Sequence, residues 1–331
     1  MYPFSSLAAR RRILATAAAA LAMAAAPRRV AAQTVWPTKP VKFIVPFAAG
    51  GPTDTIARLV AQKMQDVWKQ PVVIEYKPGG GTIVGTDFVA KSPPDGYTLG
   101  LSISAHQINP SLQPAMPYDT LKDLSGVTQL AQAHFGLFAH PSVEANTIPE
   151  LIAWAKKNPG KLSYATPGLG TGTHLAGELL KGMGGFEMVH VPYKGSAPAQ
   201  QDVIGGRVPL LFDILYSAMP FVRQGRLKVI ALASPKRAEG EPSIPLISET
   251  LPGFGAMSVM GIVAPAGVPR EVLRRIGGDI GRAVKDSELT TRMAQLGMEP
   301  VGSSPEDFDA LIRVEIDKWA KVIKAGNIKL E

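Results

Sequence analysis

The chain has 331 residues, of which 46% are hydrophobic and 19% charged, and it contains no cysteine. This composition is typical of a globular protein. The absence of cysteine excludes thiol nucleophiles, thiolate metal sites and disulfides. The formal net charge is +8 at pH 7, a value that by itself would suggest a nucleic-acid-binding protein.

Residues 1–32 are predicted to be a secretory signal peptide. Three arginines at residues 10–12 precede an alanine-rich apolar run over residues 13–26. Pro27 breaks this run, and residues 30–32 (VAA) then offer the small residues of a cleavage site. A signal peptidase recognises this combination of a charged start, an apolar stretch and a small-residue end. The apolar run is shorter than the roughly 20 residues that a membrane-spanning helix needs. An N-terminal membrane anchor is therefore the less favoured interpretation.

We expect export to the periplasm, with cleavage near Ala32. The arginines resemble a twin-arginine signal, but Ala9 stands where Ser or Thr is usual, so general secretory export stays open. The segment holds five arginines and no acidic residue, so its removal lowers the charge from +8 to 8 − 5 = +3. No cluster of about five to eight lysines and arginines follows it, and we expect neither a nucleic-acid partner nor stable membrane insertion.

The chain after the signal peptide begins with alternating predicted strands and helices. The apolar residues of the first helix follow helical spacing from Ile56 to Val67. The expected strands cover residues 42–47, 72–75 and 97–103, and the expected helices cover residues 54–67 and 79–91. This alternation predicts a parallel sheet with right-handed crossovers.

The same alternation begins again at residue 162, which predicts a second α/β lobe. The expected strands cover residues 162–166, 189–191, 208–212 and 227–233, with helices after residue 172 and over residues 196–204. Residues 136–139 and 257–264 are expected to connect the lobes. Ser304 before Pro305, with Asp307 three residues after the serine, predicts the start of a C-terminal helix.

These patterns give a domain organisation. Lobe 1 is expected to contain residues 33–132 and 256–303, and lobe 2 residues 133–255. The C-terminal helix, residues 304–331, is expected to pack on the lobes.

Glycine-rich loops follow several predicted strands, at residues 50–51, 79–81 and 168–172. Each loop opens a predicted helix, where backbone N–H groups lack partners and the helix dipole is positive. Such a start binds anions without a cationic side chain. Any one loop is more often a simple tight turn, but loops from two lobes that face each other across a cleft would hold a carboxylate at each end.

Searches for enzyme motifs find no dinucleotide fingerprint, no phosphate-binding loop, no serine elbow and no paired-histidine zinc motif. We therefore expect no catalytic residue, no metal and no cofactor. His174 and Glu178 share a helix face, but two groups do not make a metal site, and His174 is better explained as a capping or supporting residue. Asp54 is interpreted as an organiser of its helix start more than as a ligand contact, because a carboxylate repels an anion.

Several blocks of sequence resemble the substrate-binding proteins of tripartite tricarboxylate transporters, the Bug family of periplasmic receptors. The similar blocks occur in the family's order and cover nearly the whole chain after the signal peptide. They are residues 36–42 (WPTKPVK), 45–58 (VPFAAGGPTDTIAR), 78–85, 89–99 (VAKSPPDGYTL), 168–176 (GLGTGTHLA), 191–199 (VPYKGSAPA), 225–227 and 264–269 (APAGVP).

The resemblance implies a type II periplasmic-binding-protein fold, in which two α/β lobes close on a ligand cleft at a hinge. By position, it implies these ligand-binding residues: Phe47, Ala49, Gly50, Asp54, Gly81, Thr82, Ser104, His106, Thr166, Gly168, Gly170, Thr171, His174 and Asp213. Thr82 stands where the family often has glycine, Pro167 stiffens the second-lobe loop, and Val259 replaces a usual aromatic residue. These departures affect the identity of the ligand.

The resemblance further implies a monomeric protein that binds a small carboxylate: a di- or tricarboxylate, an acidic amino acid or an aromatic acid. The expected function is delivery of this ligand to a membrane permease. The alternative is a periplasmic sensor that signals to a membrane kinase, and an enzyme on the same fold is the least favoured hypothesis.

Overall fold

The computed structural model describes residues 36–47, 49, 52–113, 115–295 and 297–329. The predicted signal peptide, residues 1–32, lies outside the described residues. Lys39–Glu331 form one compact unit, which contains every element below. No helix in the described part of the chain has the length and apolar character to cross a membrane.

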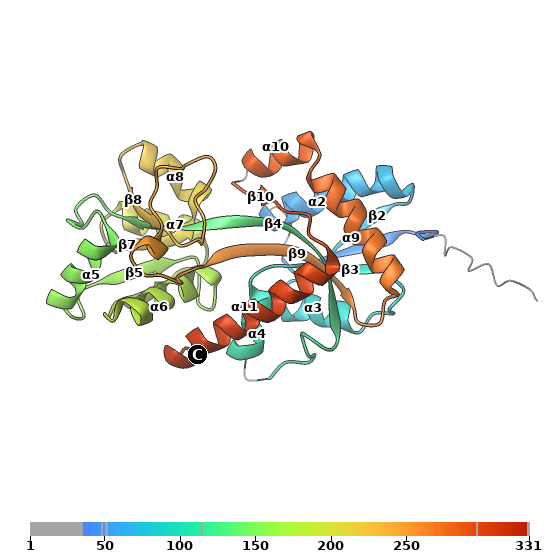
Figure 1. The fold of residues 1–331 in the computed structure, drawn as a ribbon, viewed down its shortest axis with the longest axis horizontal. Helices are drawn as coiled ribbons and strands as arrows, with labels where there is room; N and C mark the ends of the chain where they lie inside the picture. Colours follow the sequence, from blue (N-terminus) through green and yellow to red (C-terminus); the bar gives the residue numbers. More distant parts are fainter. Residues whose placement is uncertain (1–35, 48, 50–51, 114, 296, 330–331) are drawn as a thin grey trace, which may run out of the picture. The chain divides into compact units, whose positions relative to one another are not determined.

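The unit contains ten strands and ten α-helices among the described residues (Figure 1). The strands are β1 (Val41–Val45), β2 (Val72–Tyr76), β3 (Thr98–Ser102), β4 (Leu124–Ala139), β5 (Ser163–Thr166), β6 (Val189–Pro192), β7 (Leu210–Ile214), β8 (Lys228–Leu232), β9 (Met257–Pro265) and β10 (Glu299–Pro300). The helices are α2 (Pro52–Trp68), α3 (Ile83–Ala90), α4 (Ala105–Leu112), α5 (Ile148–Lys157), α6 (Gly172–Gly184), α7 (Ser196–Ile204), α8 (Leu215–Arg223), α9 (Arg270–Val284), α10 (Ser287–Gln295) and α11 (Pro305–Ala325), with 3-10 turns η1 (Gly80–Thr82) and η2 (Ile247–Glu249).

The strands form one sheet in the order β2-β1-β3-β9-β4-β7-β5-β6, and β8 and β10 also pair with β4. β1 pairs in parallel with β2 and β3, and β5 pairs in parallel with β6 and β7. We call β1–β3 with their helices the first half, and β5–β8 with their helices the second half; they lie at the right and left of Figure 1. The prediction of an α/β fold with parallel strands is confirmed.

The two halves share β4 and β9, which pair antiparallel. β4 is 16 residues long: its first part pairs with β9, and residues 135–139 pair with β7. Of β4, the sequence predicted only residues 136–139, as one of the two connections, because β4 is buried at nearly every position and shows no alternation of polar and apolar residues. The other predicted connection, residues 257–264, lies in β9. The structure thus gives a long strand that serves both halves. The lobe boundaries themselves remain a prediction.

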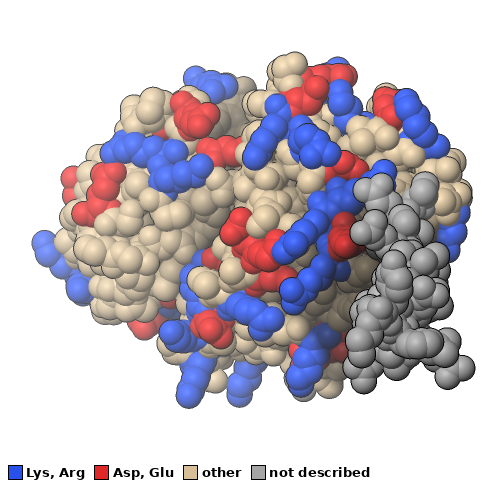
Figure 2. Space-filling view, turned by 45° about the vertical axis from the view of Figure 1, so that its right-hand side comes forward, with Lys and Arg blue, Asp and Glu red and all other residues tan. Residues whose placement is uncertain are grey.

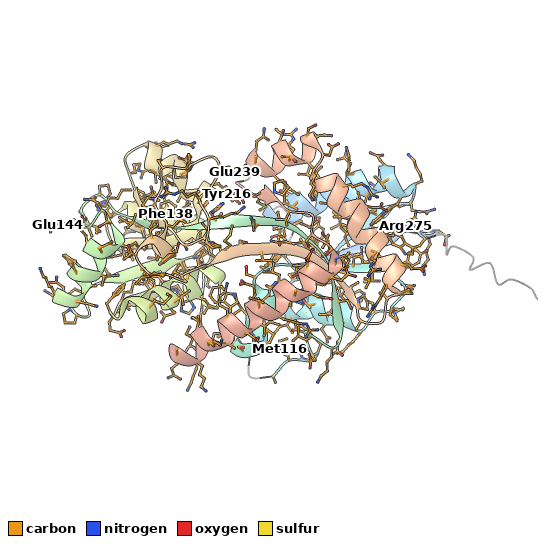
Figure 3. The ribbon with its side chains drawn as sticks, viewed as in Figure 1. Met116, Phe138, Glu144, Tyr216, Glu239 and Arg275 are labelled. Carbon is orange, nitrogen blue, oxygen red and sulfur yellow. The ribbon has the colours of Figure 1, made fainter. Side chains whose placement is uncertain are left out.

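Hydrophobic clusters fill both halves. Phe138 of β4 is fully buried in the cluster between β7, β8, α7 and α8 (Figure 3). The last helix, α11, contacts α4, β4 and α6. Its predicted start is confirmed, since Ser304 Oγ accepts a hydrogen bond from Asp307 N at 3.0 Å. On the face drawn in Figure 2, basic and acidic side chains lie interspersed.

Candidate functional site

A cavity of about 500 Å³ lies between the helix starts of the two halves. The first half contributes Thr53 from α2, Gly81 and Thr82 from η1, and Ser104 and Ala105 at the start of α4. The second half contributes Pro167, Leu169 and Gly170–Thr173 at the start of α6, together with Ser196 from α7, Asp213 and Ile214. The cavity therefore lies at the carboxyl ends of the strands, where ligands bind in open α/β sheets.

The starts of α4 and α6 approach each other closely at Gly172. A Cβ atom added to Gly172 would lie 2.9 Å from the Phe135 ring and 3.7 Å from Ser104 Cβ. Only glycine fits there without a shift of the aromatic ring. The loop that opens α6 thus faces the start of α4, an element that the sequence did not predict.

The start of α6 is held by its own side chains. Thr171 Oγ1 accepts a hydrogen bond from His174 N at 3.2 Å and donates one to Gly168 O at 2.7 Å. Gly170, at a φ of 72°, donates its N–H to His174 Nδ1 at 3.1 Å. Gly172 and Thr173, whose N–H groups precede the first intrahelical bonds, line the cavity. The loop is therefore arranged to present helix-start N–H groups to an anion.

The ring of His174 holds this loop in position. Its ring stacks on His190 with the centroids 3.9 Å apart, and His190 Nε2 is 2.7 Å from Thr166 Oγ1. Burial lowers the pKa of His174 to about 4, so the ring is neutral at pH 7 and its Nδ1 accepts the N–H of Gly170. His174 does not line the cavity; it positions a loop that does.

The buried histidines are expected to make the protein less stable in acid. Burial lowers the pKa values of His106 and His174 to about 4, below the ordinary value of 6.5. Between pH 6.5 and pH 4 the unfolded chain takes up protons that the folded chain does not, so the free energy of unfolding falls as the pH falls through this window. Urea denaturation at pH 7 and pH 4.5 measures the loss, expected to be several kcal/mol. The free energy of unfolding of the variant His106→Leu is expected to fall less over the same pH range. An equal fall in this variant would contradict the lowered pKa of His106 as a cause of the acid sensitivity.

The first half holds its loop through a buried amide. Asn109 of α4 donates its Nδ2 hydrogen to Gly81 O at 2.9 Å, and Asn109 is 4% exposed. Ser104 Oγ accepts a hydrogen bond from Val259 N of β9 at 3.1 Å. These contacts fix η1 and the start of α4 against the sheet, so the first-half wall of the cavity is preformed.

Asp213 is fully buried. Among the described residues that line the cavity, it is the only one with an ionisable acidic or basic side chain. Its carboxylate accepts hydrogen bonds from Ser196 Oγ, Gln200 Nε2 and Ile214 N, each at 2.8 Å. Burial raises the pKa of Asp213. The three donors offset the cost of burying this group and tie it to the starts of α7 and α8.

Half of the predicted ligand-binding residues line the cavity: Phe47, Gly81, Thr82, Ser104, Gly170, Thr171 and Asp213. Gly50 lies outside the described residues. The cavity wall does not include Ala49, Asp54, His106, Thr166, Gly168 or His174. Gly168 lies in the loop that opens α6, and Thr166 and His174 form hydrogen bonds with this loop.

Asp54 and His106 lie apart from the cavity wall. Asp54 is 4% exposed, accepts a hydrogen bond from Tyr76 at 2.7 Å and pairs with Arg58 at 3.0 Å, so it organises the first turn of α2. His106 lines a separate cavity of about 90 Å³ together with Asp309 and Arg313. Within the described part of the chain, neither ring nitrogen of His106 has a hydrogen-bond partner.

Several wall residues were missed by the sequence analysis. Asn109 and Leu112 belong to α4, which was not predicted, and Gln113 follows it directly. The others are Phe135 of β4, Ser258 and Met260 of β9, and Met298, which precedes β10. No glycine turn or spacing marks them. β4 shows no alternation of polar and apolar residues, so no local signal pointed to Phe135.

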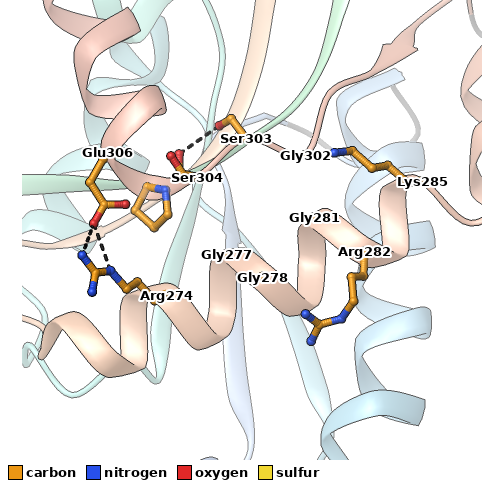
Figure 4. A pocket seen from close by; sticks show the side chains of 11 residues that line it. Arg274, Gly277, Gly278, Gly281, Arg282, Lys285, Gly302, Ser303, Ser304 and Glu306 are labelled. Atoms are coloured by element: carbon orange, nitrogen blue, oxygen red, sulfur yellow. Dashed lines mark hydrogen bonds and ion pairs between the residues drawn. The ribbon is translucent and has the colours of Figure 1, made fainter.

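A second hollow of about 550 Å³ lies between α9 and the start of α11 (Figure 4). Arg274, Arg282 and Lys285 border it, and Arg274 is bonded to Glu306 at 2.7 Å. It contains none of the predicted site residues and none of the strand-end loops. Among the described residues there is also no group of three or more histidine, aspartate or glutamate side chains placed to hold a metal ion.

Comparison with known proteins identifies the family. The family model described as "Tripartite tricarboxylate transporter family receptor" matches residues 56–328. The chain belongs to this receptor family. Protein BugT of Bordetella pertussis is 34% identical to it over 323 residues, which cover 97% of this chain and 99% of BugT. The predicted family is thereby confirmed.

Two solved structures that are similar to this chain carry a ligand in their names. "R. palustris Rpa4515 with adipate" is 33% identical, with a TM-score of 0.76 over 89% of this chain and 99% of that chain. "MatC (Rpa3494) from Rhodopseudomonas palustris with bound malate" is 30% identical, with a TM-score of 0.72 over 87% of this chain and 100% of that chain. The prediction of a periplasmic-binding-protein fold is confirmed, and the family's members are solute-binding receptors.

Proposed function

We propose that this receptor binds a small carboxylate in the cavity between its two halves and delivers it to a membrane permease from the periplasm. One observation carries the proposal: the starts of α4 and α6 converge on a cavity that has no lysine or arginine among its described wall residues. Helix starts attract carboxylates through unpaired N–H groups and the positive end of the helix dipole.

The relatives support this choice of ligand. The adipate of one solved relative and the malate of another are both small carboxylates. The sensor hypothesis uses the same binding event, so it differs in the partner and not in the cavity. A permease gene beside the receptor gene would favour transport.

A thermal-shift screen against carboxylates, amines and sugars tests the ligand class. A carboxylate present at about 100 times its Kd adds roughly 2.7 kcal/mol to the free energy of unfolding, because it binds only the folded protein. We expect a mono-, di- or tricarboxylate to raise the melting temperature. If amines or sugars raise it and no carboxylate does, the proposal is wrong. A changed ligand mass after incubation would show an enzyme in place of a receptor.

A further inference from the structure

Apart from its helix starts, the wall of the cavity is largely apolar. Phe47 and Ile103 come from the first half, Leu169 from the α6 loop, and Phe135 and Met260 from the long strands. Met298, which is 5% exposed, adds a flexible apolar side chain. The part of a ligand that lies between the helix starts therefore faces carbon and sulfur atoms.

The polar side chains of the wall are mostly bonded within the protein. Asn109 donates to Gly81, and Ser104 accepts from Val259 N. Ser196 donates to Asp213 at 2.8 Å, and the hydroxyl groups of Thr171 and Thr173 bond each other at 2.9 Å. Among the described wall residues, the side chains of Thr53, Gln113 and Ser258 form no hydrogen bond within the protein and remain as partners for a hydroxyl group on the body of a ligand. Such a hydroxyl group would exchange many water partners for these few, which disfavours its binding.

We propose that the ligand is a carboxylate with an apolar body, either a saturated chain or a ring, and that the cavity discriminates against hydroxylated acids of the same length. This inference rests on the proposed function and narrows its ligand class. The helix starts recognise the carboxylate in both kinds of acid, so they contribute little to the difference. The discrimination comes from the apolar wall.

Methionine makes the wall adaptable. Met260 and Met298 have unbranched side chains with polarisable sulfur atoms, which pack against either a chain or a ring. The cavity is therefore expected to accept several apolar bodies while rejecting hydroxyl groups on each of them.

Matched pairs of acids test the inference by isothermal titration calorimetry on the mature protein. Adipate is compared with galactarate, hexanoate with gluconate, and cyclohexanecarboxylate with quinate; each pair shares its carbon skeleton and carboxylates and differs in hydroxyl groups. In at least one pair the apolar acid is expected to bind about 100-fold tighter. A hydroxylated acid that binds as tightly as its partner, or more tightly, overturns the inference and leaves the proposed function intact. Failure of every acid to bind, in these pairs and in the thermal-shift screen, overturns both.

A matched pair of variants locates the discrimination. Leu169→Gln changes the wall at a side chain that is already 40% exposed, so folding should be unaffected. This variant is expected to bind adipate about 10-fold more weakly and to show a smaller preference for adipate over galactarate, because an apolar contact is lost. Leu121→Gln makes the same change at a 37% exposed leucine outside this cavity and is expected to change neither affinity. An unchanged preference in Leu169→Gln, or the same loss in both variants, contradicts a role for the apolar wall.

Discussion

Replacing Gly170 with aspartate is expected to lower the affinity for a carboxylate by about 100-fold or more while the fold stays intact. Gly170 lines the cavity at a φ of 72°, in the loop that opens α6. Aspartate tolerates this backbone conformation better than most residues. Its side chain would occupy the approach to the N–H groups of Gly172 and Thr173 and place a like charge beside the ligand. Calorimetry with the acid found in the thermal-shift screen measures the loss.

Two controls separate charge, volume and position. Gly170→Asn adds nearly the same volume without the charge and is expected to lose about ten-fold less affinity than Gly170→Asp. Gly160→Asp makes the same change at another glycine with positive φ, 74°, where an added Cβ meets no atom within 4 Å and which is not part of the wall. That variant is expected to bind normally. Retained affinity in Gly170→Asp would show that the ligand binds elsewhere.

Replacing Gly261 with alanine is expected to destabilise the protein by about 3 kcal/mol. An added Cβ would lie 2.2 Å from Phe308 Cζ and 2.8 Å from Thr128 O. Phe308 of α11 is fully buried, and its ring fills the space above Gly261 of β9 and Gly126 of β4. The ring has no room to retreat, so α11 must shift from the shared strands.

Urea denaturation measures this loss, which corresponds to a fall in Tm of roughly 5–10 °C. Gly182→Ala is the control, because Gly182 lies in α6 and an added Cβ meets nothing within 4 Å. Alanine is the better helix former there, so this variant is expected to gain about 1 kcal/mol. Equal stability of the two variants would contradict the packing of Phe308 against Gly261.

The parts of the fold that the sequence predicted are those with a local pattern. β1, α2 and β2 follow from apolar runs, helical spacing and glycine turns, and β5, α6 and β6 repeat the same signals. β4 was recognised only at its end, because a strand buried along nearly its whole length shows no alternation. Helices α4, α5, α8, α9 and α10 were missed. Because α4 was missed, its wall residue Asn109 was not predicted either.

The candidate site likewise contains residues that a local sequence pattern predicted and residues that no local pattern marks. Gly81 and Gly170 were predicted because a glycine turn after a strand marks a helix start that binds anions. Phe135 and Met260 reach the cavity only through the antiparallel pairing of β4 with β9, a long-range contact that no local pattern encodes. The sequence therefore predicted the helix start proposed to bind the carboxylate of the ligand, and the structure was needed to describe the apolar surface proposed to face the rest of it.

A crystal structure of the protein with the tightest-binding acid of the matched pairs tests the central claim most directly. We predict that a carboxylate oxygen accepts hydrogen bonds from the backbone N–H groups of Gly172 or Thr173, with the body of the acid against Phe135 and Met260. A ligand bound in the hollow between α9 and α11, or one whose carboxylate contacts a lysine or arginine and no helix start, would contradict this account.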